Sequence, residues 1–200
     1  MGFLTDYVHN SIQYNNHRYQ LDLAYDGVLN VQKLFKDENI SDMDHITGAL
    51  EILCKKPPRR LRAQEQAELL TLIFRQYIQI QRRKTIRPPQ RKAFDFELDG
   101  EYIYASFLQA YGIDLIDQQG KLSWRKFMAL FEGLPADTKI KEIIKIRLSD
   151  PPEPNKGNWK ERQQFLELQS YYQLPIEGGG GQDGLNRLFG ALEAQAMGGG

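Results

Sequence analysis

The feature that most constrains this chain is a series of short segments in which apolar residues recur at helical spacing, most of them followed by proline or glycine. This spacing places the apolar side chains on one face of an α-helix. Proline does not continue a helix interior, and glycine adopts the left-handed conformation that often ends a helix. The pattern predicts helices within residues 28–35, 42–53, 62–84, 99–111, 124–131, 138–148 and 159–172, with Gly112 ending the fourth.

Near the start of the chain, apolar residues recur at a different spacing, every second residue. Apolar and polar residues alternate on both sides of Asn15 and Asn16, within residues 11–23. Asparagine tolerates the positive φ of a tight hairpin turn, so this segment predicts a small β-hairpin. The expected fold class is therefore mainly α, with a compact helical domain over residues 1–177 that includes the N-terminal hairpin.

The C-terminal residues 178–200 have a different composition, because nine of the 17 glycines lie there. Gly178–Gly181 is predicted to be a flexible spacer. The residues that follow it carry an apolar face at i, i+3, i+4 and i+7, which predicts a short amphipathic helix: Leu185, Leu188, Phe189 and Leu192. Such a helix either docks on a partner, packs loosely on its own domain or stays unfolded alone. These four residues are the candidate partner-binding face.

The formal net charge of zero conceals an uneven distribution. Residues 55–92 carry 12 basic and two acidic side chains, whereas the segments before and after are acidic. The candidate basic docking surface in this segment consists of Arg59, Arg60, Arg62, Arg82, Arg83 and Lys84. Basic clusters of this kind bind phosphates or acidic protein partners, or they are simply solvated. They also complement acidic segments of the same chain or of a second copy, so a homo-oligomer stays an alternative.

The sequence offers little for catalysis or for a cofactor. It lacks a glycine-rich phosphate loop and a GxSxG nucleophile elbow, and its three histidines are scattered. Cys54 lies on an apolar helical face and is predicted to be a core residue. We therefore expect neither an enzyme nor a metal or cofactor site. No apolar run approaches the roughly 20 residues of a membrane span, so no membrane partner is expected.

We interpret two groups of acidic residues as structural rather than catalytic. The first alternates with apolar residues just before a predicted helix and consists of Asp95, Glu97, Asp99 and Glu101. Acidic side chains there cap the helix and interact favourably with its dipole. Asp114 and Asp117 lie in a short connector, where side chains commonly bond to the backbone.

The stretch of residues 99–151 resembles a known family. It carries the run Tyr111–Leu115 (YGIDL), Trp124, Lys126-Phe127 and the closing run Ile143–Arg147. These marks resemble the phage gene-product-fifteen family of tailed-phage proteins from Gram-positive hosts, and the resemblance extends over most of residues 10–174. The family-motif core comprises Tyr111, Gly112, Asp114, Trp124 and Phe127.

The resemblance implies a role in tail morphogenesis, because the genes of family members lie near the gene for the tape-measure protein. By that position they resemble tail assembly chaperones, which are non-enzymatic and shield the tape-measure protein until the tail tube forms around it. The expected partners are then the tape-measure protein and other tail proteins, in the cytoplasm of the bacterial host. The alternatives are a structural tail component or a nucleic-acid-binding protein that uses residues 55–92.

Overall fold

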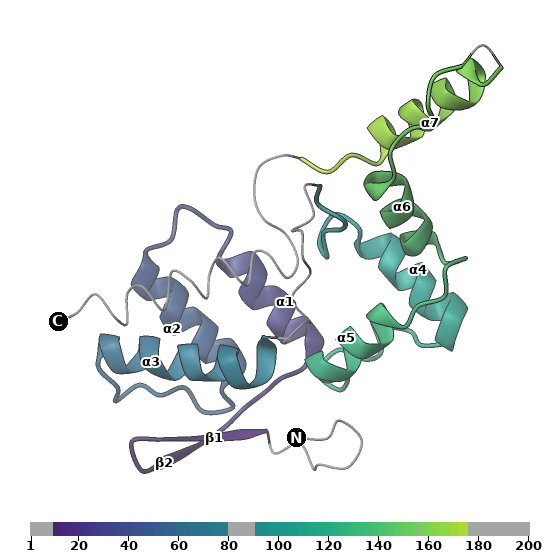
Figure 1. Ribbon diagram of the computed structural model, residues 1–200. Coiled ribbons are helices and arrows are strands. Elements are labelled where there is room, and N and C mark those ends of the chain that lie inside the picture. Colours follow the sequence, from purple (N-terminus) through teal and green to yellow (C-terminus); the bar gives the residue numbers. More distant parts are fainter. Residues whose placement is uncertain (1–9, 80–90, 156, 176–200) are drawn as a thin grey trace. The chain divides into compact units, whose positions relative to one another are not determined.

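The computed structural model describes residues 10–79, 91–155 and 157–175 (Figure 1). They form two compact units. Unit 1 contains residues 10–79 and 119–127, and unit 2 contains residues 91–118 and 128–175. The division falls inside the span 1–177 that the sequence predicts as one helical domain. The predicted mainly α class is confirmed, since seven α-helices, one π-helical turn and one two-stranded sheet make up the regular structure of the described residues.

Unit 1 begins with the predicted hairpin. Strands β1 (Ser11–Tyr14) and β2 (His17–Gln20) pair antiparallel. The two turn residues, Asn15 and Asn16, have φ values of 46° and 60°. Because a two-residue hairpin turn needs positive φ at both central positions, the asparagine pair explains both the position and the register of this hairpin.

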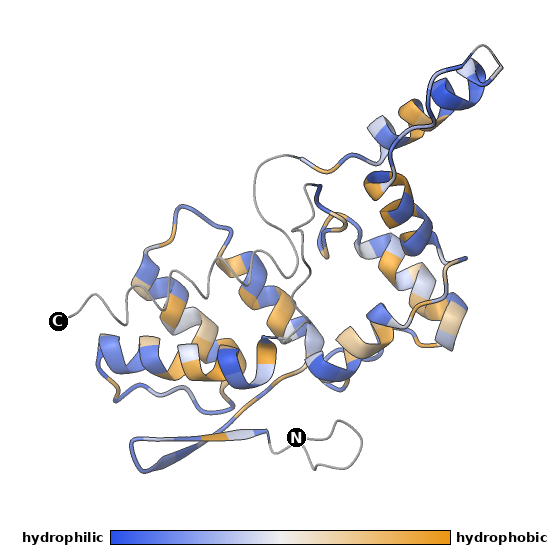
Figure 2. Cartoon of the chain, viewed as in Figure 1, coloured by the Kyte–Doolittle hydropathy of each residue, from blue (hydrophilic) through white to orange (hydrophobic). Residues whose placement is uncertain are grey.

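Three helices form the body of unit 1. Helix α1 (Tyr25–Leu34) packs on α2 (Asp42–Leu53), and α2 packs on α3 (Ala63–Ile73). Their apolar stripes appear in orange in Figure 2. Ser41 caps α2, because its hydroxyl accepts a hydrogen bond from the Asp44 N–H at 3.2 Å. Residues from all three helices are completely buried, among them Val28, Val31, Ala49, Leu53, Leu69 and Leu70.

The helix predicted over residues 62–84 ends earlier than expected. Helix α3 passes into a π-helical turn, η1 (Phe74–Ile78), and Gln79 has an extended backbone with ψ of 112°. The carbonyl of Ile78 accepts a hydrogen bond from the Trp124 indole N–H at 3.0 Å instead of continuing a helical ladder. A side chain distant in sequence thus contacts the backbone at the point where the helix ends. Residues 80–84 lie outside the described residues.

Residues 119–127 return to unit 1 after the first half of unit 2. The N–H of Tyr25 donates to the Leu122 carbonyl at 2.9 Å, and the N–H of Trp124 donates to the Leu23 carbonyl at 2.7 Å. Trp124 and Phe127 begin helix α5 (Trp124–Glu132), and both side chains are about 1% exposed. The ring of Phe127 stacks on Tyr25, with 4.8 Å between centroids. This segment therefore contributes two aromatic side chains to the core of unit 1.

Unit 2 consists of α4 (Gly100–Tyr111), the end of α5, α6 (Lys139–Leu148) and α7 (Trp159–Tyr171). Helix α6 packs on both α4 and α7. Gly112 ends α4 in the left-handed conformation, with φ of 63°, as predicted. The core of this unit is small, and its buried apolar residues are Phe96, Ile103, Phe107, Leu115, Met128, Phe131, Leu134, Ile140 and Ile143.

Candidate functional site

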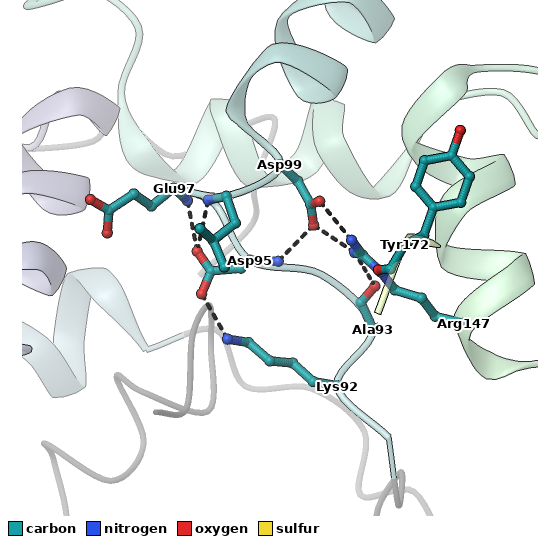
Figure 3. Close-up of polar contacts among 8 residues, drawn as sticks. Lys92, Ala93, Asp95, Glu97, Asp99, Arg147 and Tyr172 are labelled. Carbon is teal, nitrogen blue, oxygen red and sulfur yellow. Dashed lines mark hydrogen bonds and ion pairs between the residues drawn. The ribbon is translucent and has the colours of Figure 1, made fainter. Parts of the chain in front are cut away.

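The strongest concentration of buried charge lies in unit 2, at the start of α4. Asp99 immediately precedes α4, and Arg147 projects from α6 (Figure 3). Nη1 and Nη2 of Arg147 donate to Oδ2 and Oδ1 of Asp99 at 2.6 and 2.8 Å. The two side chains are 6% and 2% exposed. This fork-to-fork geometry is among the strongest arrangements available to a charge-assisted hydrogen bond.

The remaining donors of the Arg147 guanidinium bind the backbone of two further segments. Nε donates to the Tyr172 carbonyl just after α7 at 2.6 Å, and Nη1 also donates to the Ala93 carbonyl at 3.2 Å. One buried side chain therefore connects the segment before α4, the start of α4, and the end of α7. Its hydrogen bonds are directed at groups of the same unit, which is the arrangement of a structural anchor.

Asp95 organises the turn that leads into α4. Its Oδ1 accepts hydrogen bonds from the N–H groups of Glu97 and Leu98 at 2.8 and 3.1 Å, and its Oδ2 pairs with Lys92 at 2.7 Å. The N–H of Asp95 in turn donates to Asp99 at 2.9 Å. The sequence interpretation of this acidic run as a cap of the helix does not describe Asp95, which binds N–H groups of the turn before α4, and α4 has no side-chain cap at Asp99. The interpretation also missed the pairing of Asp99 with Arg147.

A local signal for that pairing does exist. Arg147 continues the apolar stripe of α6, because it follows Ile140 and Ile143 at i+7 and i+4, and both isoleucines are completely buried. A charged residue at a core-facing position requires a buried counter-charge. The sequence does not identify which carboxylate supplies it, since Asp99 lies 48 residues earlier.

Three residues of the family-motif core lie in unit 2 and hold loops. The hydroxyl of Tyr111 donates to the Leu130 carbonyl at 2.9 Å. Gly112 provides the positive φ that ends α4. Asp114 accepts hydrogen bonds from the Ile116 N–H and from the Tyr104 hydroxyl, at 2.9 and 3.0 Å. The hydrogen bond to Asp114 is also the main cause that raises the pKa of Tyr104.

The other two motif residues, Trp124 and Phe127, are core residues of unit 1. All five residues therefore have a structural explanation in packing, backbone conformation or loop hydrogen bonding. The fold alone therefore explains why these residue types stand at these positions. The motif does not by itself define a binding face.

The structure describes half of the candidate basic docking surface. Arg59, Arg60 and Arg62 are exposed in the connection between α2 and α3. Arg82, Arg83 and Lys84 lie outside the described residues, as do the four candidate partner-binding residues of the tail, Leu185, Leu188, Phe189 and Leu192. Those assignments stay predictions.

The described residues contain no cluster of three His, Cys, Asp or Glu side chains suited to a metal ion. Cys54 is buried, and burial raises the pKa of its thiol to about 11. A thiol of that kind is a poor nucleophile near neutral pH. Within the same residues, no helix combines the length and apolar character needed to cross a membrane.

Exposed apolar side chains are distributed unevenly between the two units. All the large hydrophobic side chains that are well exposed in the described residues lie in unit 2, with Leu72 of α3 as the exception. They are Leu98, Leu108, Ile116, Leu148, Trp159, Leu166, Leu168 and Tyr171. Unit 1 instead contains most of the buried apolar residues. Unit 2 is therefore the part of the described chain with apolar surface left uncovered.

Helix α7 shows this property most clearly. None of its residues is buried, and Trp159 and Tyr171 are 63% and 75% exposed. Its C-terminal end is attached to α6, because the Gln169 side-chain amide donates to the carbonyls of Ile146 and Ser149, both at 3.0 Å. Figure 2 shows apolar residues interspersed along an otherwise hydrophilic helix. A helix with so little burial is held to α6 by these contacts near its C-terminal end rather than by a shared core.

Comparison with known proteins places this architecture in a family. The family described as Bacteriophage Gp15 protein matches residues 4–174. The chain belongs to the Bacteriophage Gp15 protein family. The match includes every described helix of both units, and the whole of the glycine-rich segment 178–200 lies beyond it. Neither the curated proteins nor the solved structures include a match to the chain.

Proposed function

We propose that this Gp15 family protein is a non-enzymatic tail assembly chaperone that binds the tape-measure protein during tail morphogenesis, in the cytoplasm of the bacterial host. The observation that carries the proposal is the set of exposed apolar side chains in unit 2. Large exposed apolar patches commonly mark sites where a protein binds a partner. A chaperone for a long, partly apolar chain needs such a surface.

The two units differ in a way that suggests different roles in binding. Unit 1 has a well-buried core of helices and aromatic residues, so it is suited to be the stable scaffold. Unit 2 combines a small core with a buried anchor at Arg147 and an α7 helix that has no buried residue. Apolar side chains at the two ends of α7, Trp159 and Tyr171, are available for a partner without unfolding this unit.

Co-expression with the tape-measure protein of the same phage tests the proposal. A tagged full-length chain should co-purify with it. Replacing two exposed aromatic residues of α7, Trp159→Ser with Tyr171→Ser, should reduce the recovered tape-measure protein about ten-fold, because large aromatic anchors dominate interface energies. The matched control is Leu72→Ser in unit 1, an exposed apolar residue of α3 whose loss should leave recovery unchanged.

Two outcomes would contradict this proposal. Failure of the wild-type chain to retain the tape-measure protein would remove the chaperone role. Equal loss of recovery in the α7 variant and the Leu72→Ser control would show that unit 2 has no special part in binding.

The main alternative is a structural tail component, and it makes an opposite prediction about the finished particle. A chaperone leaves once the tail has assembled, whereas a structural component stays. Mass spectrometry of purified virions distinguishes them: absence of this protein supports the chaperone, and a stoichiometric amount supports the structural alternative.

A further inference from the structure

The connection between α2 and α3 is a basic loop, defined here as residues 55–62. It contains Lys55, Lys56, Arg59, Arg60 and Arg62 and no acidic residue, and all five basic residues are exposed. Five positive charges within eight residues form the densest concentration of one sign in the described part of unit 1. The exposed apolar residues of unit 2 are separate from this loop in the chain, so its role does not depend on the chaperone proposal.

The backbone of the basic loop is held in place. The Lys55 N–H donates to the Gln20 carbonyl at 2.9 Å, and the Arg62 N–H donates to Glu65 Oε2 at 2.8 Å. Between these points Pro57 and Pro58 fix their own φ angles, and Pro58 is buried. A loop fixed in this way loses little backbone entropy when a partner binds to its side chains.

The charges of the basic loop are not used inside the described structure. Among the described residues, the side chains of Lys55, Lys56, Arg59 and Arg60 make no hydrogen bond or ion pair with each other or with a neighbour. Arg91, by contrast, pairs with Asp150 although both are exposed. The cations of the loop are therefore available to an external anion, and arginine can hold a carboxylate through two parallel hydrogen bonds.

The surroundings of the loop indicate the size of that anion. Residues 37–51 hold five exposed acidic side chains and no lysine or arginine: Asp37, Glu38, Asp42, Asp44 and Glu51. The hydroxyl of Thr47 donates to Gln66 Oε1 at 3.1 Å, which places α2 alongside the first turn of α3, just after Arg62. The basic loop is thus bordered by the negative charge of α2, and a long polyanion that extends past the loop towards α2 would be repelled there.

We propose that the basic loop docks a short acidic polypeptide segment of a partner protein. A segment about as long as the loop matches its positive charge without reaching the acidic border. Nucleic acid fits less well, because its phosphate charge continues beyond the loop and because residues 55–62 include no aromatic side chain on which a base would stack.

Fluorescence anisotropy with the full-length chain tests this assignment. The probe is a labelled peptide of five Glu-Gly repeats, and the neutral reference is the corresponding peptide of five Gln-Gly repeats. We expect the acidic peptide alone to bind at low salt and to weaken as salt is raised, because exposed charges are screened beyond a Debye length of about 10 Å at 0.1 M. A single-stranded and a double-stranded DNA oligonucleotide, each long enough to extend beyond the loop, should bind more weakly.

Matched variants locate the binding surface. The triple variant Lys56→Gln, Arg59→Gln and Arg60→Gln should weaken binding of the acidic peptide about ten-fold, since several exposed ion pairs are lost together. The control removes three exposed lysines elsewhere, Lys126→Gln, Lys145→Gln and Lys160→Gln, and should bind as wild type. Arg59→Lys with Arg60→Lys keeps the charge and should retain most of the affinity. Thermal unfolding of each variant checks that the fold is unchanged.

Several results would overturn the proposal. The proposal is wrong if the acidic peptide does not bind at low salt. It is also wrong if the loop variant and the lysine control lose affinity for the acidic peptide equally. Tighter binding of either DNA oligonucleotide than of the acidic peptide assigns the loop to nucleic acid. Salt-sensitive self-association in analytical ultracentrifugation, lost in the loop variant, assigns it to a second copy of this chain.

Discussion

Arg147 and Asp99 form a bidentate ion pair in which both side chains are almost completely buried, with N–O distances of 2.6 and 2.8 Å. The same guanidinium binds the carbonyls of Ala93 and Tyr172. The pair therefore unites three segments of unit 2 at one point. In a unit whose apolar core is small, such a polar junction determines how α4, α6 and the end of α7 are held together.

Replacing Arg147 with methionine should destabilise unit 2 strongly. The variant leaves the Asp99 carboxylate buried without its counter-charge, and breaking a buried pair in this way costs about 3–5 kcal/mol. Hydrogen exchange followed by mass spectrometry measures the effect by segment. Amides of α4 and α6 should lose protection, whereas those of α1, α2 and α3 in unit 1 should keep it.

Two control variants test whether the loss of stability in Arg147→Met comes from the broken buried ion pair. Asp150→Ala removes an exposed partner of Arg91 and should cost no more than about 1 kcal/mol. Asp99→Leu combined with Arg147→Met removes both charges, and should recover much of the stability because no unpaired charge is left. Equal destabilisation by Asp150→Ala and Arg147→Met would contradict the role of the buried pair.

Ser106→Ala should destabilise the contact between α4 and α6. The Ser106 hydroxyl accepts a hydrogen bond from the Ile140 N–H at 3.1 Å, and it donates to the Tyr102 carbonyl at 2.6 Å. Ile140 lies in the first turn of α6, where N–H groups lack partners within their own helix. An unsatisfied buried donor costs about 1–3 kcal/mol, which urea unfolding would detect. Ser170→Ala, at an exposed serine of α7, should stay within about 0.5 kcal/mol of wild type.

The Ser106 contact also shows that the start of α6 is capped by a residue of another helix. The sequence suggests Asp137 or Thr138 as the cap, and Thr138 does occupy that position. Its hydroxyl, however, donates to the Pro135 carbonyl at 2.7 Å, and the hydrogen-bond acceptor for α6 comes from another helix. Local sequence identifies where a helix begins, but it does not reveal a partner that lies 34 residues away.

The same distinction applies to the rest of the fold and to the candidate site. Features set by neighbouring residues were predictable, such as the hairpin turn at Asn15 and Asn16 and the end of α4 at Gly112. The end of η1 at Ile78 was not, because it coincides with a hydrogen bond from Trp124. The exposure of apolar side chains on α7 could not be predicted from the sequence either. Helical spacing shows which residues share a face of the helix, but it does not show whether another element covers that face.

Gly112→Ala should destabilise the protein by about 1–2 kcal/mol, because a side chain strains the left-handed conformation at φ of 63°. The strain is conformational, since a Cβ at this position would meet no atom within 4 Å. Gly100→Ala is the matched control. It begins α4 in equally open space, and alanine there should be neutral or stabilise by up to about 1 kcal/mol. Thermal unfolding of both variants checks the opposite signs, and a loss of equal size in both would contradict this account.

Cys54 should react slowly with a thiol reagent while the protein is folded. The residue is 3% exposed, and burial raises the pKa of its thiol from 9.0 to about 11, so roughly one thiol in a thousand is ionised at pH 8. Denaturation in urea should accelerate the reaction at least about 100-fold. Because the unfolded thiol ionises at lower pH than the folded one, its contribution to stability is present below pH 9 and declines as the pH rises towards 11. Cys54→Ala should therefore lose less stability than wild type over that range, and an equal decline in both proteins would show that other groups cause it.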